Sequence, residues 1–362
     1  MTESIDVGTA SAASGAVADG WLPVTGLPTG GEERLPITVV NGAAAGPTLW
    51  VTGDEATGVA VAQDVARTAR EHADEFVGAL VVVHVVSPAG LRRNERTTYY
   101  GDEDPNRYFP DLERDSSRPP ETQERIDARL FEAVSDSADL LVDCHTAQIG
   151  SVPFAIRDRV LYGRNRTAEE AESLATDLDR MVEAFGLPVL TEYPAGEYLD
   201  QSLQRSTAGA ALNTAGIPAF TAELGGHSVV EEDARAAGVA GTFAVAVEFG
   251  LLDSVPDGVA RPGVGVPDAP VEFPVRRFVG PRSETAGLVR HRVEAGDAVS
   301  EGEVVADVCS PHGEVLDTVE SAYDGYVIGR REGIAVYEGG PVASMAVRDD
   351  GDLVVPREED GE

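Results

Sequence analysis

The stretch Leu140-Leu141-Val142-Asp143-Cys144-His145-Thr146 decides how the rest of the chain is interpreted. An apolar run of strand length ends abruptly in an acid, a thiol, an imidazole and a hydroxyl. In an α/β sheet, ligands bind at the carboxyl ends of the strands, so we expect His145 to face a cleft with Asp143 close enough to orient it. Cys144 alternates with both residues along the strand. It is therefore predicted to be a buried thiol on the opposite face rather than a nucleophile.

Charge and length limit the classes of protein to which the chain can belong. The chain has 362 residues with 63 acids against 28 bases, a formal net charge of -35, and every strong base is arginine. The length predicts two domains, or one large domain with an appendage. So acidic a chain disfavours a nucleic-acid partner, which needs a basic surface. The lysine-free acidic composition is typical of proteins from salt-loving archaea, where salt screens the self-repulsion.

The sequence also predicts a cytoplasmic protein with no membrane partner. No apolar run approaches the ~20 residues that a membrane span needs. Residues 1–20 are small, polar and acidic, without the basic start and apolar core of a secretory signal.

Strand-like and helix-like patterns alternate through most of the chain. Apolar β-branched runs at 35–42, 48–52, 79–86, 140–146 and 216–223 alternate with helical periodicity near 61–70, 123–138, 168–185 and 230–252. This alternation predicts an α/β domain. We place a flexible leader at 1–30, the α/β domain at 31–256, a Pro- and Gly-rich linker at 257–274, a small all-β domain at 275–350 and an acidic, disordered tail at 351–362. Phrases in the β domain resemble biotinyl/lipoyl-like barrel-sandwich folds, but without a lysine to modify we expect a structural module.

Residues 87–121 show no clear periodicity and are rich in arginine. Loops this long in compact domains are usually functional or disordered. In a chain with few bases, arginines beside a cleft indicate a carboxylate-binding site. The alternative is that they pair with the surrounding acids. The arginines are Arg92, Arg93, Arg96, Arg107, Arg114 and Arg118.

Acids at two other predicted strand ends have two interpretations each. Asp54 and Glu55 stand between a strand and its crossover helix, where the helix dipole alone favours acids. Glu223 ends a strand just before Gly225-Gly226. It is either a general base in a cleft or a cap of the helix that follows.

Four stretches, in this order, resemble the succinylglutamate desuccinylase/aspartoacylase family, a branch of the zinc carboxypeptidase-like fold. They are residues 53–58, 87–110, 143–146 and 221–226. The resemblance covers most of the chain, including the β domain. It implies a three-layer α/β/α domain with a mainly parallel or mixed sheet. It also implies a hydrolase that cleaves the acyl-amide bond of an N-acyl amino acid or a similar small carboxylate.

The resemblance further implies one zinc ion per chain, held by a His-x-x-Glu turn and a second His. Glu55 and His145 fall on the Glu and on the second His, and Glu223 falls on the general base. The positions that hold the substrate are Arg96, Asn106 and Arg107. The expected partner is a small anionic substrate, and self-association into a homo-oligomer is left open.

The chain departs from the family at the first zinc-binding His. Read without gaps, its place is Thr52; read with a short deletion, which we favour, the residues between Gly53 and Asp54 are missing. Asp54 and His227 are the candidates for a substitute ligand. The rival function is a catalytically silent member that only binds carboxylates. We favour the enzyme because both remaining ligands and the base are retained.

Overall fold

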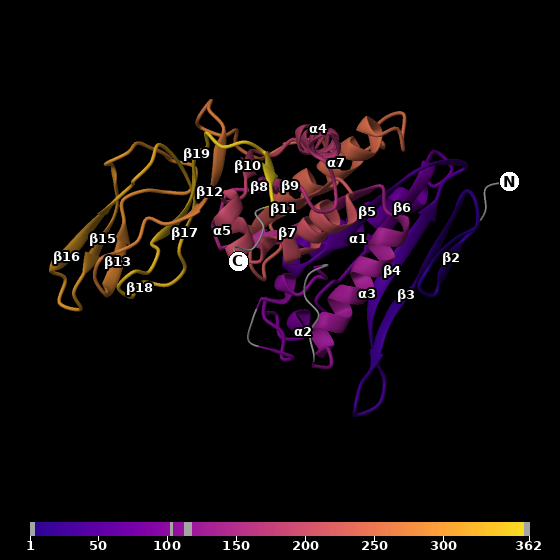
Figure 1. Cartoon of the computed structure of the whole chain (residues 1–362), viewed down its shortest axis with the longest axis horizontal. Helices are drawn as coiled ribbons and strands as arrows, with labels where there is room; N and C mark the ends of the chain where they lie inside the picture. The colour runs from indigo at the N-terminus through magenta and orange to yellow at the C-terminus, as the bar shows by residue number, and fades with distance from the viewer. Residues whose placement is uncertain (1–3, 102–103, 112–117, 358–362) are drawn as a thin grey trace.

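We describe residues 4–101, 104–111 and 118–357 of the computed structural model. Among them, twelve strands form one mixed sheet that runs the length of the molecule (Figure 1). In sheet order the strands are β14 (Ala298–Val299), β17 (Gly325–Arg330), β19 (Ala343–Arg348), β12 (Val275–Val279), β10 (Val189–Thr191), β8 (Phe154–Arg157), β11 (Ala219–Gly226), β7 (Leu140–Ala147), β5 (Ala44–Gly53), β6 (Val77–Val83), β4 (Glu32–Asn41) and β3 (Ala16–Gly26).

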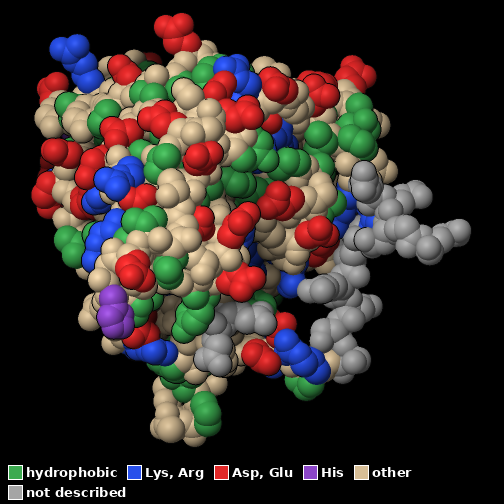
Figure 2. All heavy atoms as spheres, turned by 90° about the vertical axis from the view of Figure 1, so that its left-hand side faces the viewer, with side chains coloured by type: hydrophobic (Ala, Val, Ile, Leu, Met, Phe, Trp, Pro, Cys, Tyr) green, Lys and Arg blue, Asp and Glu red, His purple; other side chains and the backbone are tan. Residues whose placement is uncertain are grey.

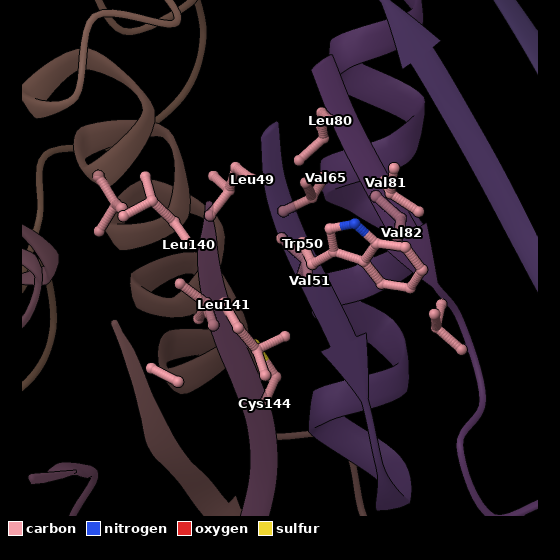
Figure 3. Packing of buried hydrophobic residues seen from close by; sticks show 14 of the residues in the cluster. Leu49, Trp50, Val51, Val65, Leu80, Val81, Val82, Leu140, Leu141 and Cys144 are labelled. Carbon is pink, nitrogen blue, oxygen red and sulfur yellow. The ribbon is translucent and has the colours of Figure 1, made fainter. Parts of the chain in front are cut away.

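The middle of this sheet is parallel and fully buried. Strand β5 pairs in parallel with β6 and β7, and β7 pairs in parallel with β11. Parallel strands covered on both faces become continuous apolar runs, as in Leu49-Trp50-Val51, where all three side chains are inaccessible (Figure 3). Cys144 lies in the same apolar packing, which confirms that its thiol is buried.

Helices cover both faces of the central strands. On one face, α1 (Glu55–Glu71) packs beside α7 (Glu232–Glu248), which packs against α4 (Ala168–Phe185). On the other face lie α3 (Thr122–Ser137) and α6 (Thr207–Ala210). The α/β prediction is therefore confirmed. The remaining helical segments are α2 (Pro88–Leu91), η1 (Pro105–Arg107), α5 (Ala195–Asp200), η2 (Leu203–Arg205) and the π-helical η3 (Ala211–Ala215).

One close contact fixes α1 against β7. Val61, Val65 and Ala69 form its buried stripe, at the spacing of a helix face. A side chain at Gly58 would put its Cβ 2.1 Å from the carbonyl oxygen of Cys144. Glycine is therefore required there, and it holds the start of α1 close to the end of β7.

The predicted flexible leader is wrong. Strands β1 (Ile5–Val7) and β2 (Ala10–Ala12) form a ribbon, and β3 pairs along most of β4 at the edge of the main sheet. Val7, Ala10 and Leu22 are buried in the main core. The small Ala, Ser and Thr residues of this region give a weak strand pattern, yet they pack because the edge of the sheet offers a ladder of hydrogen bonds.

The C-terminal region is joined to the main sheet. Strands β12, β14, β17 and β19 continue it, and a separate four-stranded sheet contains β16 (Val315–Glu320), β15 (Val304–Cys309), β13 (Gly287–His291) and β18 (Ala335–Val336). Residues 257–274, predicted as a linker, form neither helix nor strand. The tail prediction is wrong at β20 (Val354–Pro356), which pairs in parallel with β9 (Val160–Tyr162). Residues 358–362 of that predicted tail lie outside the described residues.

Acidic side chains are spread over the face shown in Figure 2, with arginines between them. In the part of the chain that the structure describes, no helix combines the length and apolarity required to cross a membrane.

Candidate metal and substrate site

The ends of two neighbouring strands bring three potential metal ligands together. Strands β5 and β7 are in parallel register, with Thr52 opposite Asp143, so the turn after β5 lies beside the end of β7. This turn carries Asp54 and Glu55, and β7 carries His145. One ligand atom from each of these three residues lies within 4.8 Å of the others.

Hydrogen bonds orient the imidazole of His145. Its Nε2 lies 2.8 Å from Oδ2 of Asp143, and Oδ1 of Asp143 accepts a 2.6 Å hydrogen bond from the hydroxyl of Thr52. The other ring nitrogen, Nδ1, lies 3.6 Å from Oδ2 of Asp54. Histidines that bind metals commonly hold their second nitrogen on a carboxylate in this way. Nδ1 is therefore the nitrogen that faces the cluster.

The charges in this cluster influence one another strongly. Burial raises the pKa of Asp54 to about 6, although the neighbouring His145 opposes the rise. Burial disfavours the charged imidazole, but Asp143 and the two nearby acids raise the pKa of His145 to about 10. A bound cation would stabilise the charged acids that crowd around this imidazole.

Glu55 is held in a strained conformation. Its φ of 58° lies in the left-handed region, which is unusual for a residue with a side chain. Its Oε1 accepts a 2.7 Å hydrogen bond from Arg96, and its Oε2 accepts hydrogen bonds from the backbone and hydroxyl of Thr146. Residues with such strain cluster at functional sites, where the surroundings enforce it.

The donor set fits a divalent metal ion. An imidazole nitrogen and two carboxylates are ligands that zinc accepts. Each carboxylate oxygen has two lone pairs. Oε1 of Glu55 accepts one hydrogen bond and keeps a lone pair for a metal, whereas Oε2 uses both of its lone pairs on Thr146. Of the two candidates for a substitute ligand, Asp54 belongs to this group. His227 lies outside it and forms an ion pair with Glu332 at 3.0 Å.

Glu223 lies next to the cluster with an unsatisfied oxygen. It is opposite His145 in the register of β11 and β7. Among the described residues, its buried Oε2 has no hydrogen-bond partner. Burial raises the pKa of this carboxyl above its ordinary value. A carboxylate in this state can accept a proton from a group bound in front of it.

The three residues predicted to hold substrate are brought together beside His145. Asn106 accepts a hydrogen bond from the backbone of Thr207 at 2.7 Å, and its amide nitrogen lies 3.3 Å from Nε2 of His145. Arg96 binds Glu55 and also Asp104, at 3.0 Å. Arg107 donates to the carbonyl of Asn106 at 2.6 Å. Burial lowers the pKa of Arg107, although Asp104, 3.7 Å away, opposes the fall.

The other arginines of this loop follow the alternative interpretation. Arg92 pairs with Glu33, Arg93 with Glu95, and Arg118 with Glu124. Arg96 and Arg107 also lie against an acid, Asp104, but both line the cleft beside the cluster. Arg114 lies outside the described residues.

Two neighbouring cavities with shared lining residues lie beside the cluster. The outer one, of about 340 Å³, is bounded by Glu55 and Thr146 on one side and by Arg277, Ile328 and other C-terminal residues on the other. The inner one, of about 40 Å³, is lined mainly by residues of the α/β domain, such as His145 and Asn106, together with Arg277 from β12. Both share Arg96, Arg107, Glu223 and Arg277. The combined space suits a small molecule rather than a polymer.

Sequence reasoning missed three residues of the inner cavity. Arg277 comes from β12, and its guanidinium donates to Glu192 at 2.8 Å. Asp158 and Glu192 follow directly after β8 and β10. Each ends a short strand, the signal that singled out His145 and Glu223, but these strands are too short to stand out.

A family model and a known protein match this sequence. The model of the succinylglutamate desuccinylase/aspartoacylase catalytic domain matches residues 51–248. The chain is 25% identical over 332 residues to N-alpha-acetyl-L-2,4-diaminobutyric acid deacetylase from Halomonas elongata, covering 87% of this chain and 86% of that protein.

Solved structures show the same fold. A succinylglutamate desuccinylase/aspartoacylase from Rhodobacter sphaeroides superposes with a TM-score of 0.69 at 21% identity, over 92% of this chain and 95% of that chain. The product-bound ectoine utilization protein EutE (DoeB) from Ruegeria pomeroyi gives a TM-score of 0.69 at 22% identity, over 91% and 95%.

Proposed function

The chain belongs to the succinylglutamate desuccinylase/aspartoacylase family, and from this we propose that it is a zinc-dependent deacylase of small N-acylated amino acids. The observation that carries the proposal is the grouping of Asp54, Glu55 and His145 beside the unsatisfied Oε2 of Glu223. A set of metal ligands with a proton acceptor beside it is what metal-assisted amide hydrolysis requires. The deacetylase relative from Halomonas elongata supports the same reaction class.

We assign the metal to Asp54, Glu55 and His145, with Asp54 in the role of the missing histidine. Zinc is favoured over harder cations because one of the three ligands is an imidazole. When bound, the metal would polarise the amide carbonyl and lower the pKa of water towards ~7.

The chain's own residues then carry the proton and hold the substrate. Glu223 takes a proton from the attacking water and delivers it to the amide nitrogen as the carbon–nitrogen bond breaks. The products are a carboxylate and a free amine. Arg107 and Arg277 bind the carboxylate of the amino acid, and Asn106 presents its amide nitrogen beside His145.

One observation favours the rival function, a silent member that only binds carboxylates. The 2.7 Å bond from Arg96 to Glu55 neutralises a proposed ligand without any metal. In a protein that no longer binds a metal, such a pair would stabilise the side chains of the cluster in place of the ion.

Metal analysis separates the two proposals. We expect the protein purified in high salt to contain about one zinc ion per chain, and His145→Ala to lose it. The zinc-loaded protein should release amine from N-acetyl or N-succinyl amino acids, and Glu223→Gln should not. Failure to bind zinc or another divalent metal, even when it is supplied in excess, would reject the hydrolase.

A further inference from the structure

A third cavity lies where the C-terminal strands meet the α/β domain. It has a volume of about 550 Å³, and we call it the seam cavity. A space of this size accommodates a small molecule. The mechanism proposed above does not use it. Its walls come from Arg159 and Pro194 on one side and from Arg276, Tyr323 and residues 348–352 on the other.

The seam cavity and the inner cavity of the candidate site are formed by consecutive residues of the same segments. Arg276 and Arg277 follow one another on β12, so their side chains leave the strand on opposite faces. Arg277 lines the inner cavity, whereas Arg276 lines the seam cavity. After β8, Asp158 and Arg159 are divided between the two cavities in the same way. Among the described residues, the two cavities have no lining residue in common, so they are separate sites.

A buried arginine fixes one wall of the seam cavity. Arg159 is 2% exposed, and its guanidinium donates to both carboxylate oxygens of Asp349, at 3.1 and 3.0 Å. It also donates to the carbonyl of Asp352 at 2.8 Å and to that of Tyr193 at 3.2 Å. These bonds hold residues 349–352 against the α/β domain. They also use the donors of Arg159, which is therefore not the group that would bind a ligand.

Arg276 is the cation of this cavity that has no acid partner. Among the described residues it forms no ion pair, and its one hydrogen bond is a long contact of 3.4 Å with the carbonyl of Arg277. Its guanidinium lies 5.4 Å from the centre of the Tyr323 ring. A guanidinium presents its donors in a fixed plane that matches the two oxygens of a carboxylate. Arg276 can therefore bind a carboxylate without giving up another partner.

A second arginine lies close to Arg276. Arg348 follows Val347, the residue opposite Arg276 in the register of β12 and β19, and it lines the same cavity. Its guanidinium is stacked 3.7 Å from the centre of the Phe273 ring, and Asp324 is 3.6 Å away. Two neighbouring arginines thus offer positive charge to one ligand.

Three exposed acids line the same cavity. They are Glu301, Asp350 and Asp352, and among the described residues their carboxylates form no hydrogen bond or ion pair. These acids would repel a simple anion that approached the arginines. A molecule with a carboxylate and an ammonium group would be attracted by both kinds of residue.

We propose that the seam cavity binds a free α-amino acid, with its carboxylate on Arg276 and Arg348 and its ammonium group facing the three exposed acids. The bound molecule would lie on the residue next to Arg277, one of the two arginines assigned above to the carboxylate of the substrate. The inference goes beyond the proposed deacylase, for which a free amino acid is only a product. Its test measures binding and requires neither metal nor turnover.

Equilibrium dialysis with radiolabelled alanine tests the proposal on the full chain at fixed salt. Arg107→Gln serves as the background, because it removes an arginine assigned to the candidate site. We expect this variant to bind about one alanine per chain. Adding Arg276→Gln should weaken that binding at least tenfold, whereas adding Arg290→Gln, an exposed arginine of β13 outside the cavity, should leave it unchanged. Arg348→Gln provides a second variant if Arg276→Gln does not fold.

Acetate and methylamine show whether the ligand must carry both charges. Each should bind at least tenfold more weakly than alanine. No binding of alanine by the folded Arg107→Gln protein, or binding that neither Arg276→Gln nor Arg348→Gln weakens, would overturn the inference. Acetate that binds as tightly as alanine would overturn the assignment to an amino acid. None of these results bears on the deacylase, since the metal cluster and Glu223 take no part in the measurement.

Discussion

Replacing Thr52 with valine tests whether the chain of hydrogen bonds behind His145 supports metal binding. The Thr52 hydroxyl donates to Asp143 at 2.6 Å, and Asp143 holds Nε2 of His145 at 2.8 Å. Thr52 and Asp143 are both fully buried. Valine has nearly the same shape as threonine, so the substitution removes this hydroxyl and little else.

The expected loss can be estimated from the bond that is removed. A hydrogen bond to a charged group contributes about 1.5–3 kcal/mol. At about 1.4 kcal/mol per tenfold change, this sets an upper limit of roughly 100-fold on the loss of metal affinity. Removal of an outer partner of a metal-bound histidine costs about 10–100-fold. We therefore expect Thr52→Val to bind zinc at least tenfold more weakly, with the remainder of the effect appearing as lower stability of the metal-free protein.

The assay is competition between the metal-free protein and a chromophoric chelator at fixed pH in high salt. Thr52→Ser, which keeps the hydroxyl, should restore most of the affinity. Thr48→Val, on the same strand but outside the cluster, should match the wild type. A zinc affinity of Thr52→Val within threefold of the wild type would refute the role assigned to Thr52 and Asp143.

Three further predictions address the base, a buried acid and the core. Glu223→Gln should lower kcat by about 10²–10⁴-fold with unchanged metal content, and loss of the metal would contradict its assignment as a base. Asp127, buried on α3 with a raised pKa, keeps its proton when folded at pH values where the unfolded chain has lost it. Stability should therefore fall as pH rises above about 4 and through the raised pKa, by at most about 1.4 kcal/mol per pH unit. In urea unfolding at several pH values Asp127→Asn should flatten this dependence, whereas Asp136→Asn, exposed on the same helix, should not; identical slopes would contradict the prediction. Leu141→Ala, at a fully buried position of β7, should cost about 2–5 kcal/mol in chemical denaturation, and a loss under about 1 kcal/mol would contradict its place in the core.

The central fold could be predicted because its strands are buried on both faces. Residues 79–83 and 140–142 are apolar at every position, as parallel strands buried on both faces require. Residues 4–26 could not be placed in this way. Their side chains are small, and their strands are specified mainly by pairing at an edge of the sheet.

The residues of the candidate site also fall into two groups, those that the local sequence indicates and those that it does not. His145, Glu55 and Glu223 stand at abrupt changes from apolar to polar sequence, so each could be found locally. Asp158 and Arg277 come together only because β8, β10 and β12 are neighbours in the sheet. These strands come from segments that are far apart in the chain. Sheet order of this kind depends on tertiary packing, and no local pattern encodes it.

The continuous sheet also suggests how such proteins can change their substrates over time. The groups assigned to the chemistry lie on β7, β11 and the turn after β5, whereas Arg277 arrives on β12 from the C-terminal region. Substitutions in that region can reshape the wall of the cleft while the cluster around His145 keeps its supports. A recombined protein that takes its residues from β12 onward from a relative should thus inherit the relative's preference for the amino acid and keep its own reaction.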